Sequence, residues 1–101
     1  MCGRYALYGP HSRLREQFGV EPVPSNWRDR YNIAPTQTAP VIRVDEDGAR
    51  YVLDARWGLV PSWAKGPGTL HQPINAKLET AAEMPMFRHA LKRSRVLVPA
   101  Y

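Results

Sequence analysis

The chain has 101 residues, a net charge of +5 at pH 7, and an ordinary balance of 44% hydrophobic and 23% charged residues. This length allows one small domain at most, and the balance excludes an intrinsically disordered chain. No apolar run approaches the ~20 residues that a membrane-spanning helix needs, and the first residues lack the apolar segment of a secretory signal.

A single cysteine excludes an internal disulfide framework, which favours a reducing, cytoplasmic compartment. Proline occurs 10 times, about twice the usual ~5%, which predicts many loops and short helices. The basic excess is compatible with a polyanionic partner but is weak support for one when taken alone.

The first third of the chain predicts a strand, a helix and a loop. Residues 2–8 are mixed and aromatic and precede a Gly-Pro pair, which favours a strand. Ser12 is the expected N-cap of a helix over residues 13–18, and Gly19 is its expected C′ residue. Residues 20–30 contain two prolines and few periodic apolar positions, so they are expected to form a loop.

The middle of the chain predicts a β-hairpin. Residues 31–35 are expected to be extended, because the position before a proline disfavours helix. Residues 39–44 and 49–57 are rich in β-forming side chains, and an acidic segment ending in Gly48 separates them. This arrangement predicts two antiparallel strands joined by a tight turn.

The last third predicts a loop over residues 58–73, helix over residues 79–93 and a strand over residues 96–98. Pro85 is expected to divide the helical stretch and to be the first residue of a second helix. Because the sequence ends directly after an apolar strand, we expect the chain to be the N-terminal portion of a longer domain. Its open sheet edges would then favour self-association or pairing with the absent portion.

Cys2 carries the most reactive chemistry in the sequence. If Met1 is removed, Cys2 has a free α-amine with an ordinary pKa near 7.7–8 and a free thiol with one near 8.5. Such a 1,2-aminothiol can condense with an aldehyde to an imine, which the thiol then closes into a thiazolidine. With Met1 in place the nitrogen is an amide and this ring cannot form. The alternative interpretation is that Cys2 is a small apolar residue at the start of a strand.

Several sequence blocks occur in a fixed order. They are Met-Cys-Gly-Arg-Tyr from residue 1, Tyr-Asn-Ile-Ala-Pro-Thr-Gln from 31, Trp-Gly-Leu-Val-Pro-Ser-Trp from 57, Ile-Asn-Ala-Lys-Leu-Glu-Thr from 74, Met-Phe-Arg from 86 and Leu-Val-Pro-Ala from 97. In this order they closely resemble the SOS response-associated peptidase (SRAP) family of abasic-site processing proteins, over the whole chain.

The resemblance implies an α+β fold with a curved, mainly antiparallel, barrel-like β-sheet core and short flanking helices, here as one incomplete domain over residues 1–101. It also implies an enzyme of the DNA damage response that binds single-stranded DNA and captures the aldehyde of an abasic site through Cys2. The product would be a thiazolidine DNA–protein crosslink. The family further implies autocatalytic N-terminal processing, hence a thiol peptidase, and lyase chemistry. A DNA-binding role in the cytoplasm would place the protein at the nucleoid.

Individual roles follow from the same resemblance. Asn75 is expected to lie beside Cys2 and orient the substrate, and its amide can both donate and accept hydrogen bonds. The DNA-binding positions are Arg4 and Lys77 for phosphates, Trp63 for stacking near a bend, and Asn32 and Pro35 along the cleft. The alternative role of Trp63 is a loop aromatic folded over a small core.

Other notable residues receive structural interpretations. Trp27 and Trp57 are core candidates, and Glu79 is expected to cap a helix or pair with a base. The three histidines show no ligand-like spacing, so neither a metal nor a cofactor is expected. A solvated helix face is the expected role of four basic residues, Arg88, Lys92, Arg93 and Arg95.

The sequence also departs from the family pattern. The family domain is about twice as long and continues into a block whose glutamate acts near Cys2, then to a histidine that promotes imine chemistry, and neither position exists here. Ala64 stands where the family has a second aromatic, and Lys77 replaces a frequent arginine.

Three alternatives stay open at this point. One is an amidotransferase with an N-terminal cysteine, which the downstream blocks do not fit. The second is a basic fragment that binds single-stranded DNA without covalent chemistry and with steep salt dependence. The third is a misfolded fragment without a function of its own.

Overall fold

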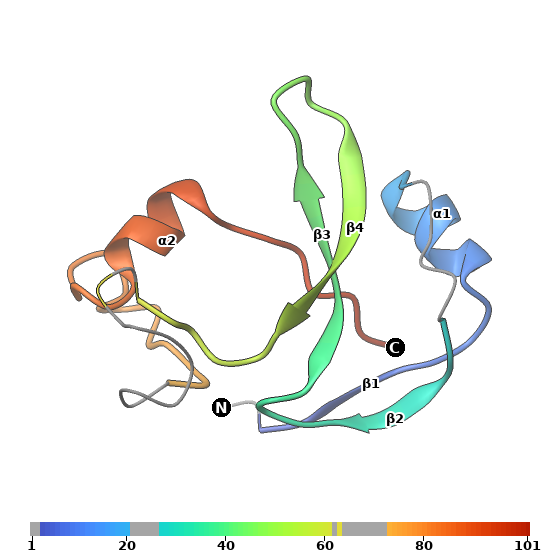
Figure 1. Ribbon diagram of the computed structural model, residues 1–101, viewed down its shortest axis with the longest axis horizontal. Coiled ribbons are helices and arrows are strands. Elements are labelled where there is room, and N and C mark those ends of the chain that lie inside the picture. The colour runs from blue at the N-terminus through green and yellow to red at the C-terminus, as the bar shows by residue number, and fades with distance from the viewer. Residues whose placement is uncertain (1–2, 21–26, 62, 64–72) are drawn as a thin grey trace.

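The computed structural model describes residues 3–20, 27–61, 63 and 73–101. Among these, four strands form two separate two-stranded antiparallel sheets, and two short helices lie on either side of the longer sheet (Figure 1). The expected α+β class with antiparallel pairing is confirmed. The described strands form no closed barrel, because the two sheets are not joined by a ladder of hydrogen bonds. No helix among the described residues is long and apolar enough to cross a membrane.

The first sheet pairs β1 (Tyr5–Leu7) with β2 (Arg30–Ile33). Tyr5 lies opposite Ile33 and Leu7 lies opposite Arg30, so the register shifts between the two pairs. Cys2, which the sequence analysis placed in this first strand, lies outside the described residues. The expected extended segment holds through Ile33 and then bends into a turn at residues 35–36, so that expectation was wrong for its last positions.

The second sheet is the predicted hairpin of β3 (Thr38–Val44) and β4 (Arg50–Arg56). Its register is regular over seven pairs, from Thr38 opposite Arg56 to Val44 opposite Arg50. The Asp45 carboxylate accepts hydrogen bonds of 2.9 Å from the backbone N–H groups of Asp47 and Ala49. Gly48 has φ +85°, a conformation that an L side chain rarely adopts. The acidic Gly-ended segment therefore closes the hairpin by its own local chemistry.

Helix α1 (Ser12–Phe18) follows the prediction within one residue. Gly19 ends it in the left-handed conformation at φ +65°, as expected of a C′ glycine. The predicted Ser12 cap was wrong, because the helix begins one residue earlier and His11 occupies the N-cap position without a side-chain hydrogen bond. Leu14 on the inner face of the helix is fully buried.

Helix α2 is shorter than the sequence predicted and spans only Arg88–Arg93. The expected helix around residues 79–84 consists of isolated turns, in which Thr80 and Ala81 donate to the carbonyl of Lys77. Pro85 is not the first residue of the second helix, because Phe87 is the N-cap and α2 starts at Arg88. No residue of α2 is fully buried, so the helix has little of the apolar packing that would stabilise a longer one.

The predicted strand at residues 96–98 is reduced to one bridge. Leu97 exchanges two backbone hydrogen bonds with Ile42, at 2.9 and 3.0 Å, along the free edge of β3. The three apolar side chains of this segment stay exposed.

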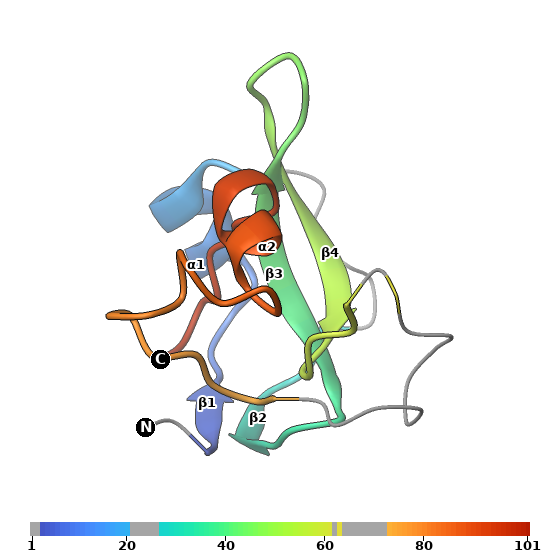
Figure 2. The same cartoon turned by 90° about the vertical axis from the view of Figure 1, so that its left-hand side faces the viewer.

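The core consists of two small clusters of buried side chains. One contains Leu7, Ile33 and Ala39, and the other contains Leu14, Val20 and Ile42. The half-buried rings of Trp27 and Tyr101 pack against both clusters. Figure 2 shows the resulting arrangement, with the β3–β4 hairpin rising above the β1–β2 pair and α2 on the near side. Trp27 and Trp57 both pack against the core, as predicted.

Candidate functional site

Two of the predicted DNA-binding residues lie on the β1–β2 pair. Arg4 immediately precedes β1 and Asn32 lies within β2, and both are exposed. They flank the pair formed by Tyr5 and Ile33, whose side chains lie toward the core. Because successive side chains of a strand alternate between faces, Arg4 and Asn32 belong to the outer face of this sheet.

Pro35 belongs to a tight turn that leads from β2 to β3. The Gln37 side-chain oxygen accepts a hydrogen bond of 3.0 Å from the N–H of Ala34 and one of 3.1 Å from the guanidinium of Arg30. Thr36 has φ +74°, which is unfavourable for a β-branched residue. Backbone bonds compensate for this strain, since Thr36 donates to the carbonyl of Trp57 at 2.9 Å.

Trp57 connects three distant segments and defines what we call the Trp57 cluster, made of Tyr5, Trp57 and Ile74. The indole ring lies 5.7 Å from the Tyr5 ring at an interplanar angle of 57°. Its Nε1–H donates a 2.9 Å hydrogen bond to the carbonyl of Ile74. The main-chain N–H of Leu59 adds a 3.4 Å bond to the carbonyl of Pro73. The segment that carries Asn75 is thereby attached to the start of β1.

The structure therefore brings four predicted residues to one end of the β1–β2 pair. Arg4 precedes Tyr5 and Asn75 follows Ile74, both members of the Trp57 cluster. Asn32 precedes the partner of Tyr5 in β2, and the turn at Pro35 is bonded to Trp57 itself. Asn75 is half-buried there.

The remaining predicted residues are Lys77, Trp63 and Cys2. Lys77 lies two positions beyond Asn75 and is exposed. Its carbonyl accepts the N–H of Thr80 in the turn that follows. Trp63 is 59% exposed, and its sequence neighbours on both sides lie outside the described ranges. Cys2 also lies outside the described residues, so the proposed nucleophile has no described position.

The ionisation of two tyrosines reflects their surroundings. Burial raises the pKa of the Tyr5 phenol, and the nearby Arg30 guanidinium partly opposes this shift. The Asp29 carboxylate is the main cause of a raised pKa at Tyr31, because a nearby negative charge disfavours phenolate. Both phenols are therefore neutral near pH 7.

Sequence reasoning missed the positioning role of Trp57 and Gln37. Trp57 was correctly assigned to the core, but its bond to Ile74 joins residues that are 17 positions apart. Both residues belong to the ordered blocks of the sequence, which was the only signal that could have drawn attention to them.

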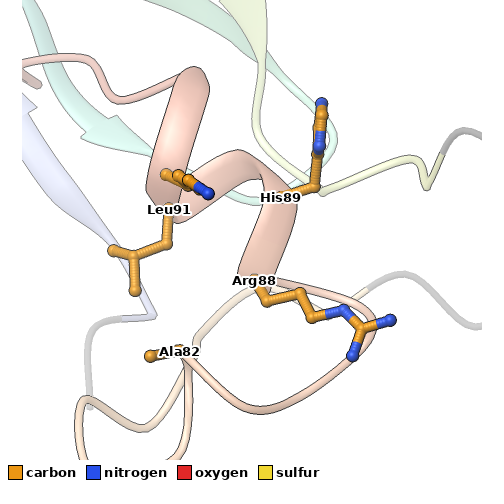
Figure 3. Close-up of a pocket in the computed structure, with 5 residues that line it drawn as sticks. Ala82, Arg88, His89 and Leu91 are labelled. Atoms are coloured by element: carbon orange, nitrogen blue, oxygen red, sulfur yellow. The ribbon is translucent and has the colours of Figure 1, made fainter.

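A shallow hollow lies against α2 and the preceding turn (Figure 3). In the close-up, Leu91 and Ala82 provide apolar walls, whereas the Arg88 side chain extends away from them. Arg88, Lys92 and Arg93 are exposed on α2, which confirms the predicted solvated helix face for these three. Arg95 is also exposed but lies beyond the end of the helix. Among the described residues no three histidine, cysteine or acidic side chains gather in a group that could hold a metal ion.

Comparison with known proteins gives consistent matches over the whole chain. A sequence model of the family described as SOS response associated peptidase (SRAP) matches residues 1–101. "Abasic site processing protein YoaM" of Bacillus subtilis is 36% identical over 103 residues, covering 99% of this chain and 44% of that protein. "Abasic site processing protein HMCES" of Mus musculus is 31% identical over 117 residues, covering 94% of this chain and 33% of that protein.

One solved structure has the same fold. It is a crystal structure of a protein from Bordetella bronchiseptica, with a TM-score of 0.75 and 23% sequence identity. The match covers 98% of this chain and 48% of that one. The chain thus spans less than half the length of the proteins that it matches here.

Proposed function

The chain belongs to the SRAP family, and from this premise we propose that it captures abasic sites in single-stranded DNA as a covalent crosslink through Cys2. The names of the relatives support a role in processing abasic sites. The observation that carries the proposal is the Trp57 cluster, which attaches the segment of Asn75 to the strand that follows Cys2.

The proposed reaction requires the free N-terminus of Cys2. Removal of Met1 exposes the α-amine. The autocatalytic N-terminal processing that the family resemblance implies is one route to this removal. The amine attacks the aldehyde of the ring-opened deoxyribose, and loss of one water gives an imine. The thiol sulfur then bonds to the imine carbon and the thiol proton passes to the imine nitrogen. A five-membered thiazolidine results. The amine and thiol are partly nucleophilic near neutral pH, because their ordinary pKa values lie near 8.

Asn75 is the proposed orienting residue. Cys2 and Tyr5 are three positions apart in the sequence, which limits their Cα separation to about 10–11 Å. Tyr5 contacts the Trp57 ring, and Trp57 binds the carbonyl next to Asn75. The half-buried amide of Asn75 can donate to the aldehyde oxygen and accept from the N-terminal amine.

Arg4 and Lys77 are the proposed phosphate contacts. Both are exposed, so their charges are available to a polyanion. An abasic nucleotide has no base to read, so backbone contacts and stacking must hold the strand. Asn32 extends this surface along the outer face of the sheet, and Pro35 extends it at the turn that follows β2. Exposed Trp63 is the proposed stacking residue near the lesion.

The test mixes the tag-free chain with a single-stranded oligonucleotide that contains one abasic site. Denaturing electrophoresis and intact mass are read together, with the Cys2→Ala variant and an undamaged oligonucleotide as controls. We expect a heat-stable adduct that depends on Cys2 and has the summed mass less one water. Absence of this adduct, from protein whose mass shows that Met1 is gone, would refute covalent capture by this chain. Salt-dependent binding without an adduct would instead support a non-covalent DNA-binding module.

A further inference from the structure

Two tyrosines stack on each other at the surface, at the end of the β1–β2 pair away from Arg4. The rings of Tyr8 and Tyr31 have centroids 5.4 Å apart and an interplanar angle of 26°. Tyr31 is 68% exposed and Tyr8 is 40% exposed. We call these two residues the tyrosine pair. Tyr8 covers one face of Tyr31, so the large exposed remainder of Tyr31 offers aromatic surface to a ligand.

Hydrogen bonds hold the tyrosine pair in place. The Tyr31 hydroxyl donates to one oxygen of Asp29 at 3.3 Å, and the other oxygen accepts the N–H of Gly9 at 2.9 Å. The carbonyl of Gly9 in turn accepts the indole N–H of Trp27 at 3.0 Å. The pair is therefore anchored to the core through Trp27. Because the two side chains are already ordered, stacking of a ligand costs them little further conformational entropy.

One guanidinium lies beside the tyrosine pair. A nitrogen of Arg13 lies 3.5 Å from the carbonyl oxygen of Tyr8, and the guanidinium carbon lies 3.9 Å from the centroid of the Tyr101 ring. The carboxylate of Asp29, also close to the pair, is engaged by the bonds above. An anionic ligand with a flat aromatic group matches this combination, and a nucleotide has both parts.

We infer that the tyrosine pair is a stacking platform for an undamaged base of the same single strand, with Arg13 beside the neighbouring phosphate. This inference rests on the proposed function, which brings single-stranded DNA to this sheet. Arg4 immediately precedes β1 and Tyr8 immediately follows it, so the two are four positions apart, which corresponds to about 13 Å of extended chain. The platform therefore engages a base a few nucleotides from the lesion, and it tolerates any base because each has a π-face.

The test measures non-covalent binding to an undamaged single-stranded oligonucleotide, so that covalent capture plays no part. Fluorescence anisotropy gives the affinity, and 2-aminopurine at successive positions reports stacking through quenching of its emission. Tyr31→Ala is expected to weaken binding about tenfold and to abolish quenching at one position. Tyr31→Phe keeps the ring, so its affinity should stay within about twofold of the parent. Tyr51→Ala, on β4, is the matched control and should change neither signal.

The outcomes separate the two proposals. Binding of the parent chain that Tyr31→Ala leaves unchanged would overturn the platform while the proposed function stands. Equal loss in Tyr31→Ala and Tyr31→Phe would also overturn it, since the ring would not be the binding group. Ring-dependent binding without crosslinking of an abasic oligonucleotide would support the platform and refute covalent capture. A parent chain that does not bind single-stranded DNA would overturn both.

Discussion

The two sheets differ in how they are built and in what they carry. The β3–β4 hairpin is regular over seven pairs, closes through its own turn and contributes Ala39 and Ile42 to the core. The β1–β2 pair is short, has a shifted register and carries Arg4 and Asn32 on an exposed face. Regular, local pairing therefore provides the frame of the molecule, whereas the irregular sheet presents the candidate site.

The largest expected effect tests whether the hairpin provides the stability. Ile42 is 2% exposed, so Ile42→Ala should lower the free energy of unfolding by about 2–5 kcal/mol. Val44→Ala, on an exposed residue of the same strand, should change it by less than about 0.5 kcal/mol. Urea denaturation followed by circular dichroism measures both. Equal losses would show that burial in β3 does not determine stability.

The second prediction concerns the connection between the sheets. Trp57→Phe keeps an aromatic ring against Tyr5 but removes the N–H that donates to Ile74. We expect a loss of about 1 kcal/mol in stability and slower capture of an abasic oligonucleotide, because the segment of Asn75 loses its anchor.

Tyr101→Phe is the matched control for this prediction. It keeps the ring and removes a hydroxyl bond of similar length, 2.8 Å, to the side-chain oxygen of Gln17. It should cost a similar stability without slowing capture. If both variants slow capture equally, the effect comes from general destabilisation and not from the position of Asn75.

A smaller effect is expected from removing one surface charge of the β1–β2 pair. Arg4→Ala should leave the free energy of unfolding unchanged. It should reduce the slope of log binding constant against log salt concentration by about 0.7, the amount expected for one phosphate contact. Arg43→Ala on β3 should not change this slope. Anisotropy titrations at several salt concentrations check the prediction. A reduced slope in the Arg43 variant alone would show that the β3–β4 hairpin, and not the β1–β2 pair, contacts the DNA.

The smallest expected effect is a pH dependence of stability at Tyr5. Burial raises its pKa in the folded chain above the usual value of about 10. Below that pH both states keep the proton and the contribution to stability is complete. As pH rises past 10 and through the raised pKa, the unfolded state releases its proton first and stability falls. Tyr5→Phe should lose stability less steeply than the parent between pH 9 and 11 in urea titrations, and parallel curves would contradict the burial of this phenol.

The sequence by itself determined the features that depend on neighbouring residues. The Asp45–Gly48 turn and its two strands follow from turn chemistry and β-forming side chains within one short segment. The end of α1 at Gly19 follows from the freedom of glycine to adopt positive φ. The ordered blocks of the sequence also indicate the family, because they are a property of the sequence alone.

Only the tertiary structure decided which distant residues meet. The bond from Trp57 to Ile74 and the stacking of Tyr8 on Tyr31 join separate segments, and no local pattern encodes such contacts. The absence of helix over residues 79–87 has the same origin, since a short helix needs a buried face to persist and Ala81 is the one buried residue of this segment. Local propensity acts over a few residues, whereas the candidate site depends on how two sheets pack around one tryptophan.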